Sequence, residues 1–241
     1  MIKRFRTRLN FSQILKNFGF KGAKETRYFS ERNILLEKQK AIYFFIPKVA
    51  CSSIKKICSD LLCLESDSII QIHINKYPFI FRKKIAKYNN YFKFTFVRNP
   101  WDRIVSCYKN KIREKSLNNQ HFVNGVFSRF ITYGTFTPEM SFEDFVKAIC
   151  EISDEDANVH FQSQYKFITD KKGKIIVDFI GQFENIDKDF NKICKKLKIN
   201  VKLPHLMKSE KKDYKEYYTK ETKEMIRKRY KKDIEMFGYN F

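Results

Sequence analysis

The sequence predicts an α/β protein in which a central parallel sheet is flanked by helices. Short runs rich in β-branched and aromatic residues alternate with longer segments of helical periodicity, as in parallel strands joined by helices. The chain has 241 residues, 43% hydrophobic and 16% aromatic, enough for one substantial core. No linker rich in Pro, Gly or Ser divides it. We therefore expect a basic segment that could be helical at residues 1–40 and one domain at 41–241.

The first half of the domain is predicted to contain two strands, each followed by a helix. AIYFFI at 41–46 is the first strand, and a helix follows from Ser52 to about Leu64. QIHIN at 71–75 is expected to be a short strand or a strand end. KFTFV at 93–97 is the second strand, which leads into a helix from Trp101 to about Lys115.

The second half begins with a long polar stretch. Residues 116–140 carry only isolated aromatics, which predicts a surface excursion rather than a core element. Ser141, followed by an acidic first turn, is the expected start of the next helix. The third strand is IIVDFIGQF at 175–183, and the helix after it is expected to have Asp187 as its N-cap.

The C-terminal region is predicted to end in one long helix. This helix runs roughly from Lys220 to Met236, with Thr219 as its N-cap. The last five residues, FGYNF, are apolar enough that we expect them to dock on the core.

The charge of the chain is strongly positive. The chain carries 49 Lys and Arg against 27 Asp and Glu, a formal net charge of +22, which attracts polyanions, nucleotides and anionic membranes. The basic and partly apolar segment at 1–22 could lie on anionic lipid, although a helix packed on the domain is the favoured interpretation. The charge alone does not choose among these partners.

The expected compartment is the cytoplasm. No run of about 18 apolar residues is present, and the N-terminus lacks the apolar core of a signal peptide. The six cysteines form no CxxC pair and no cluster with the four histidines, so a zinc site is not expected. Reduced thiols are the expected state.

A first candidate anion site lies directly after the first strand, in IPKVACSSIKK at 46–56. A strand that ends in small hydroxyl residues before a helix brings backbone N–H groups together around an anion, and Lys48 adds a point charge. The pattern lacks the GxxxxGK[ST] of nucleoside triphosphatases, which disfavours that class. The candidate ligands of the anion are Pro47, Lys48, Val49, Ala50, Cys51, Ser52 and Ser53.

A second candidate anion site follows the second strand, in FTFVRNPWDRIVSCYKNK at 94–111. The strand places Arg98 at its carboxyl end, and a proline suits the first turn of the helix that follows. Arg98 and Ser106, about two helical turns further on, could hold one phosphate from two sides. For Arg103, a salt bridge with Asp102 or a place on the surface is the favoured interpretation.

The two segments together resemble two motifs of the carbohydrate sulfotransferases that use 3′-phosphoadenosine 5′-phosphosulfate (PAPS). PKVACSSIKK is similar to their 5′-phosphosulfate-binding motif and FVRNPWDRIVSCYKN to their 3′-phosphate-binding motif, with most similarity to the chondroitin/HNK-1 branch and its bacterial relatives. The resemblance extends through VHFQSQYKFI at 159–168 and DFIGQFENIDKDF at 178–190, and covers roughly residues 42–241. It implies a three-layer, P-loop-like fold with PAPS as co-substrate and no required metal.

The resemblance also implies roles for individual residues. Lys48 matches the lysine that stabilises the leaving oxygen of the donor, and Arg98 and Ser106 match the residues that hold the 3′-phosphate. A late basic loop, here with Lys208 and Ser209, would wrap the nucleotide. Glu184 and Asn185 match a family signature and are interpreted as structural support for the site.

A general base is needed to activate a sugar hydroxyl, and histidine is the usual choice near neutral pH. His73 and His160 are both candidates, and the sequence does not choose between them. His121 and His205 are interpreted as structural.

The function that the resemblance implies is sulfuryl transfer to a hydroxyl of a carbohydrate, on a polysaccharide or a lipid-linked glycan. A bacterial-type cytoplasmic member is expected, since the membrane anchor and luminal disulfides of the Golgi enzymes are not evident. Phe161 stands where tryptophan is common, which leaves the acceptor open.

Two other classes remain as alternatives. A small-molecule or nucleotide kinase would explain the strand-loop-helix anion site but predicts a Walker lysine and acidic magnesium ligands. An RNA-binding module would explain the charge but not the spacing of Arg98 and Ser106. Nucleic acid is therefore not an expected partner.

Overall fold

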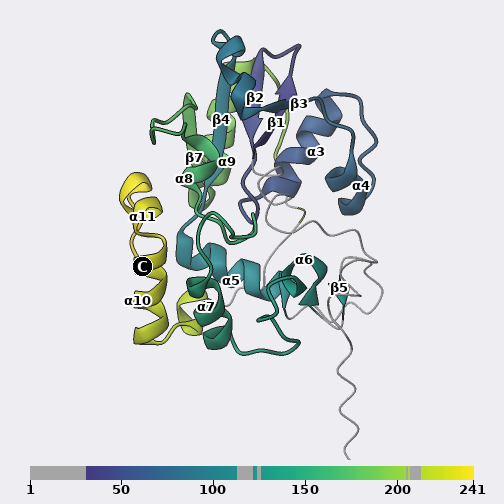
Figure 1. Cartoon of the computed structure of the whole chain (residues 1–241). Coiled ribbons are helices and arrows are strands. Elements are labelled where there is room, and N and C mark those ends of the chain that lie inside the picture. The colour runs from purple at the N-terminus through teal and green to yellow at the C-terminus, as the bar shows by residue number, and fades with distance from the viewer. Residues whose placement is uncertain (1–30, 113–121, 124–125, 205, 207–212) are drawn as a thin grey trace, which may run out of the picture.

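The structure is a computed structural model, and it describes residues 31–112, 122–123, 126–204, 206 and 213–241. Its centre is a five-stranded sheet of order β3-β1-β2-β4-β7, with helices packed around it (Figure 1). The predicted fold class, an α/β protein with a central sheet flanked by helices, is confirmed. Of the basic segment expected at residues 1–40, residues 1–30 lie outside the described residues.

The three predicted strands form the parallel part of the sheet. They are β2 (Ala41–Phe44), β4 (Phe92–Val97) and β7 (Phe179–Gln182). β4 pairs in parallel with β2 on one side and with β7 on the other. The carboxyl ends of all three strands therefore lie at one edge of the sheet, where ligands of such folds bind.

Two further strands, which the sequence analysis did not predict, make the sheet mixed. β1 (Arg32–Leu36) pairs antiparallel with β2, and β3 (Phe79–Phe81) pairs antiparallel with β1. The turn between β1 and β2 contains neither Gly nor Pro and instead places Lys40 at a φ of 46°. The usual sequence signal for a hairpin is therefore missing. β1 lies on the N-terminal side of the boundary expected at residue 41.

The segment QIHIN is helical, so the prediction of a strand there was wrong. After α3 (Cys51–Leu61), the chain forms the short helix α4 (Ile69–Ile74). Ser68 caps α4 by accepting a hydrogen bond from the backbone N–H of Gln71 at 3.1 Å. Only Ile72 of α4 is buried, because one apolar residue per turn suffices to pack so short a helix.

The stretch 116–140 contributes to the core where the structure describes it, so the prediction of a surface excursion was wrong for that part. It contains β5 (Phe122–Val123), β6 (Val126–Phe127) and α6 (Ser128–Ile131). Phe130 is fully buried and Phe136 nearly so. The isolated aromatics are the core residues of this segment, and their spacing follows neither helical nor strand periodicity.

The predicted helices after β4 and at Ser141 are confirmed. α5 (Pro100–Lys111) ends earlier than the expected Lys115, and residues 113–115 lie outside the described residues. α7 (Phe142–Glu151) has Ser141 as its N-cap, which accepts from the N–H of Asp144 at 3.0 Å. Both helices pack in the half of the molecule away from the five-stranded sheet (Figure 1).

The C-terminal third differs from the prediction in two details. The helix α9 (Ile186–Leu197) has Asn185 rather than Asp187 as its N-cap residue, because the 3₁₀ turn η2 (Phe183–Asn185) leads straight into it. The single last helix is two, α10 (Lys220–Arg229) and α11 (Lys231–Phe237), with Tyr230 between them. The buried Tyr230 donates its hydroxyl hydrogen to the carbonyl of Phe161, which fixes the bend.

Other features of this region are as predicted. Thr219 caps α10 in a capping box with Thr222. Phe237 and Tyr239 are buried against the core, and Phe241 packs on Trp101 with ring centroids 5.5 Å apart. The remaining short elements are α8 (Tyr165–Ile168), η1 (Arg82–Tyr88) and η3 (Tyr214–Tyr217).

The buried side chains form two clusters. The first surrounds the sheet and includes α3 and α9, and the second lies between α5, α7 and α10. α5 begins at the end of β4 and runs into the second cluster (Figure 1). The loops at the carboxyl ends of β2 and β4 therefore lie where the two clusters meet.

Candidate active site

The loop between β2 and α3 has an unusual backbone. Lys48 and Ala50 have φ values of 69° and 48°, in the left-handed region that side chains other than glycine rarely occupy. Such residues cost about 1–3 kcal/mol each and persist only where the surroundings hold them. Alternating left-handed residues bring successive N–H groups to one side, which forms a concave site for an anion.

The start of α3 adds further donors to this loop. Ala50 is the N-cap residue, and no side chain caps the helix. The first N–H groups of an α-helix have no acceptor inside it, so those of Cys51, Ser52 and Ser53 are available to a ligand. Val49 is fully buried and Ser53 nearly so, while Cys51 and Ser52 are partly exposed. The loop therefore offers backbone N–H groups more than side chains.

The side chain of Lys48 is held from α5. Its Nζ donates to Oδ1 of Asn110 at 3.0 Å. Burial lowers the pKa of Lys48 to about 8, and the positive charges of Lys111 and Arg98 act in the same direction. An anion beside Lys48 would raise this pKa again, since it would stabilise the charged form.

Arg98 is buried at the end of β4 and fully oriented. Its Nε and Nη2 both donate to the carboxylate of Asp102 at 2.8 Å, and Nη1 donates to the carbonyl of Lys48 at 3.0 Å. The ring of Phe183 stacks on the guanidinium, with its centroid 4.1 Å from Cζ of Arg98. A guanidinium has five N–H hydrogens, so two remain for a ligand. Both could go to one phosphate group.

Ser106 lies on the same helix as the partners of Lys48 and Arg98. Asp102, Ser106 and Asn110 are spaced four residues apart, so they form one stripe along α5. Asp102 contacts Arg98 and Asn110 contacts Lys48, which places the partly exposed Ser106 between these two contacts. The structure thus brings Lys48, Arg98 and Ser106 to one place.

His73 reaches the same loop from α4. Its Nε2 lies 2.9 Å from Oγ of Ser52, and both side chains are accessible to solvent. His73 therefore lies beside the loop between β2 and α3 with the first residues of α3, 45–53, which we call the donor loop. The segment that carries His73 is a helix and not a strand.

His160 lies in a different environment. Its Nδ1 is 2.7 Å from Oδ1 of Asn158, and its ring meets that of Phe127 edge-on at 5.1 Å. Because an amide oxygen only accepts, Nδ1 carries the hydrogen, and Nε2 is left as an acceptor. Burial, together with the charges of Lys111 and Lys48, holds the pKa of His160 well below its usual range. The ring is thus neutral near pH 7, the state that a general base requires.

Arg103 is neither paired with Asp102 nor on the surface, so both readings of it were wrong. It is 1% exposed and donates to three backbone carbonyls, those of Pro47 at 3.1 Å, Gln162 at 2.7 Å and Val159 at 3.1 Å. Arg103 directly follows Asp102 in α5, but its side chain points inward, toward the loop between β2 and α3. The carboxylate of Asp102 is taken by Arg98 instead.

Two residues of the family resemblance have structural roles. Glu184 accepts hydrogen bonds from the N–H of Asn99 at 2.7 Å and from the hydroxyl of Tyr239 at 3.0 Å, which fixes the start of α5. Phe161 is fully buried in the second cluster. Its side chain therefore packs in the core.

Several predicted residues lie outside the described residues. They are Lys208 and Ser209 of the late basic loop and the two histidines His121 and His205.

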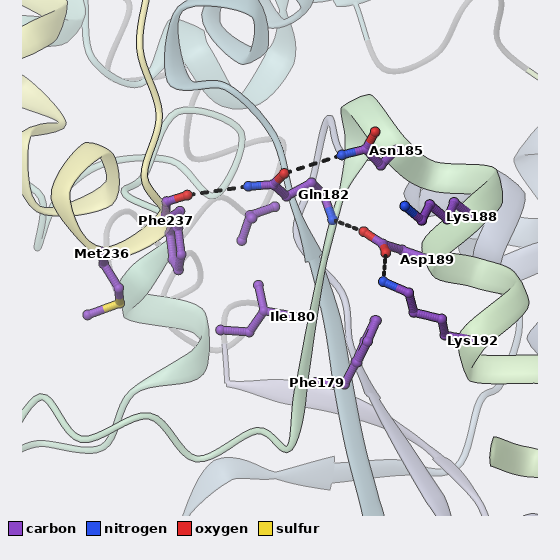
Figure 2. A pocket seen from close by; sticks show the side chains of 10 residues that line it. Phe179, Ile180, Gln182, Asn185, Lys188, Asp189, Lys192, Met236 and Phe237 are labelled. Atoms are coloured by element: carbon purple, nitrogen blue, oxygen red, sulfur yellow. Dashed lines mark hydrogen bonds and ion pairs between the residues drawn. The ribbon is translucent and has the colours of Figure 1, made fainter.

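A pocket lies elsewhere, between β7, α9 and α11 (Figure 2). Its volume is about 370 Å³, and its walls include Ile180, Met236 and Phe237. Gln182 crosses it, since its Nε2 donates to the carbonyl of Phe237 at 3.3 Å and its backbone N–H donates to Asp189 at 3.0 Å (Figure 2). None of the residues predicted to hold the donor lines this pocket, so we do not take it as the donor site.

Comparison with known proteins identifies the family. The model of the sulfotransferase family matches residues 32–240, which include the whole sheet and all the site residues described above. The chain belongs to the sulfotransferase family. Members of this family use PAPS as the sulfate donor, in agreement with the resemblance of the two anion sites.

The curated relatives are carbohydrate sulfotransferases. Carbohydrate sulfotransferase 14 of Mus musculus is 26% identical over 173 residues, 67% of this chain and 46% of that protein. Carbohydrate sulfotransferase 11 of Rattus norvegicus is 25% identical over 236 residues, 85% of this chain and 66% of that protein. The chain thus spans about half to two thirds of the length of these relatives. No solved structure matches the chain.

The described part of the chain contains no group of three or more His, Cys, Asp or Glu side chains that could hold a metal ion. All six cysteines are free thiols. No helix among the described residues has the length and apolarity to cross a membrane.

The sequence analysis missed four partners of the predicted residues. They are Asp102 and Gln164 for Arg98, Asn110 for Lys48, and Asn158 for His160. Gln164 accepts from the N–H of Arg98 at 2.9 Å and donates to its carbonyl at 2.8 Å. A helical spacing of four residues from Asp102 through Ser106 to Asn110 was the available signal for two of them.

Proposed function

We propose that this chain transfers a sulfuryl group from PAPS to a hydroxyl of a carbohydrate. The observation that carries the proposal is the convergence of Lys48, Arg98 and Ser106 at the carboxyl ends of β2 and β4, in a member of the sulfotransferase family. The names of the curated relatives support a carbohydrate as the acceptor.

The donor would be held at both of its charged ends. The N–H groups at the start of α3, with Lys48, suit the 5′-phosphosulfate, because a helix N-terminus and an ammonium group both stabilise an anion. The two remaining hydrogens of Arg98, with the hydroxyl of Ser106, suit the 3′-phosphate. The contacts to Asp102 and Phe183 fix the orientation of the Arg98 guanidinium. The remaining hydrogens on Nη1 and Nη2 are then the ones that would meet the ligand.

Lys48 would supply the main electrostatic contribution to catalysis. Sulfuryl transfer needs an in-line nucleophile and stabilisation of the charge that builds on the bridging oxygen of the leaving group. The ammonium group of Lys48, once its contact to Asn110 is exchanged for the donor, is placed to stabilise that charge. Loss of such a group typically costs about 10²- to 10³-fold in rate.

Either His73 or His160 would remove the proton from the acceptor hydroxyl. His160 is neutral, with a free Nε2, and lies close enough to Lys48 for their charges to interact. His73 contacts Ser52 of the donor loop and is accessible to solvent. The position of His73 beside Ser52 and the neutral ring of His160 support each as a candidate, and the proposal does not choose between them.

The finer features of the proposal concern the acceptor and the location. A polysaccharide or a lipid-linked glycan would suit the positive charge of the chain, and the basic N-terminal segment would then contact the membrane surface.

We propose a cytoplasmic location, which the free thiols support. Cell fractionation with an antibody to the chain tests it, and recovery with the membrane lumen would contradict it.

The first experiment is calorimetry of the purified protein with 3′-phosphoadenosine 5′-phosphate (PAP), the desulfated donor, and separately with ATP and magnesium. We expect micromolar or tighter binding of PAP and about 100-fold weaker binding in Arg98→Ala, since loss of one buried charge partner costs about 2–5 kcal/mol. Arg227→Ala is the control, because Arg227 is exposed on α10 and pairs with Glu224 of the same helix at 3.2 Å. Absent PAP binding, or a preference for ATP with magnesium, would favour a kinase instead.

A further inference from the structure

Two buried arginines hold two successive carbonyls of the donor loop. Arg103 donates to the carbonyl of Pro47 at 3.1 Å, and Arg98 donates to the carbonyl of Lys48 at 3.0 Å. The two arginines are 1% and 7% exposed. Their contacts fall on the part of the loop where Lys48 and Ala50 adopt left-handed backbone angles. Both arginines therefore oppose the relaxation of a strained segment.

Arg98 has an obvious second task in holding a phosphate, but Arg103 does not. Its other two hydrogen bonds go to the carbonyls of Val159 and Gln162, on either side of His160. The nitrogens of a guanidinium are fixed relative to one another. One rigid planar group thus connects the loop that carries Lys48 to the segment that carries His160.

The environment of Arg103 indicates that its geometry matters more than its charge. No carboxylate among the described residues forms an ion pair with it, so its direct partners are carbonyl oxygens, and Asp233 and Asp154 act on its charge only from a distance. Burying a guanidinium in this way costs free energy that an apolar residue would not cost. What the fold gains is the fixed distance between two segments of the site.

We propose that Arg103 is a positioning residue that keeps the donor loop in its anion-binding shape and fixes the distance between Lys48 and His160. The inference rests on the proposed function, and it assigns to Arg103 no contact with the donor or the acceptor. Its role is exerted through the backbone of Pro47 on one side and of Val159 and Gln162 on the other.

The test compares three variants for PAP affinity by calorimetry. In Arg103→Lys, a single ammonium group cannot reach three carbonyls, so the loop relaxes and we expect about tenfold weaker binding. Adding Ala50→Gly should recover part of this loss, because glycine adopts a positive φ without strain. Tyr108→Phe is the matched control. It removes a hydrogen bond from α5 to the carbonyl of Met140, at 2.8 Å, and should bind PAP as the wild type does.

Three results would overturn the proposal. They are wild-type affinity in Arg103→Lys, an equal loss in Tyr108→Phe, and no recovery on adding Ala50→Gly. If Arg103→Lys alone does not fold, the double variant Arg103→Lys/Ala50→Gly is compared with the single variant Ala50→Gly. Equal affinities of these two proteins for PAP would overturn the proposal.

A second measurement needs no ligand and separates this proposal from the proposed function. In amide NMR spectra of the free protein, the resonances of 48–53 and 159–162 should shift together in Arg103→Lys and stay in place in Tyr108→Phe. Movement of only one segment would refute the coupling. If the wild type does not bind PAP at all, the sulfotransferase proposal fails, and the spectra still decide whether Arg103 couples the two segments.

Discussion

Lys48 combines a left-handed backbone with a side chain whose charge is easily lost. Burial is the largest cause that disfavours the protonated form, and the neighbouring cations Lys111 and Arg98 act in the same direction. The acceptor that it does have, Asn110, is neutral. Lys48 is therefore ready to bind an anion and, in the free protein, sensitive to pH in a range where most lysines are not.

This sensitivity leads to a prediction for the pH dependence of the reaction. The pKa of Lys48 is lowered from 10.5 to about 8, so the free enzyme loses this charge as the pH rises through about 8. We expect kcat/KM for PAPS to fall above that pH, because this constant reports the free enzyme. The measurement is donor hydrolysis or transfer to an acceptor between about pH 6 and 10.

Lys48→Arg is the control for this prediction. Arginine stays charged over the whole range, so the variant should be less active but should show no decline near pH 8. A wild-type profile that stays flat to about pH 10 would contradict the lowered pKa. The same decline in both proteins would mean that another group titrates.

At the scale of the elements, α5 organises the site. One of its faces carries Asp102, Ser106 and Asn110 toward the donor loop, and Arg103 points inward from an adjacent position. The apolar side of the same helix lies in the second cluster, with Trp101 and Ile104 almost fully buried. Packing of α5 in that cluster is what fixes the polar face relative to β2 and β4.

The contact between β4 and β7 is tight at Gly181, and this gives a second prediction. A Cβ atom at Gly181 would lie 2.5 Å from the buried ring of Phe96, which is too close for any real contact. Gly181→Ala should therefore destabilise the protein by about 1–3 kcal/mol, the usual cost of overpacking. Urea denaturation followed by circular dichroism measures it.

The double variant Gly181→Ala/Phe96→Leu tests the cause. Leucine is smaller than phenylalanine, so it should relieve the clash and make the effect of Gly181→Ala smaller in this background. If the two substitutions were additive, the loss of stability would not come from contact with Phe96.

At the scale of the whole molecule, the net charge of +22 gives long-range attraction but no specificity. In the proposed function, specific recognition of the donor would depend instead on a few fixed groups between the two buried clusters, among them Lys48, Arg98 and Ser106. These two contributions differ in their dependence on salt, because counterion release grows with the number of phosphates that are contacted.

We therefore expect different salt dependences for RNA and for PAP. Binding of a single-stranded RNA should weaken by about 10³-fold or more between about 50 and 200 mM salt, while the affinity for PAP should fall far less. Fluorescence anisotropy with labelled RNA and calorimetry with PAP make the comparison. Salt-resistant RNA binding that PAP does not displace would support the alternative of an RNA-binding module.

The sequence by itself determined the parallel strands and the residues that follow them. β2 and β4 are apolar runs that end in polar motifs, and such local patterns are readable because strand and helix starts depend on adjacent residues. Lys48, Arg98 and Ser106 were identified from these motifs and their resemblance to a family, and the structure brings them together.

Only the tertiary structure decided the partners of these residues and the elements without a local pattern. The inward position of Arg103 depends on carbonyls more than 50 residues away in the sequence, at Pro47 and Gln162. β1 and β3 depend on antiparallel pairing, and the helical state of 69–74 depends on a single cap and one buried side chain. Contacts between distant segments outweigh local preference where that preference is weak.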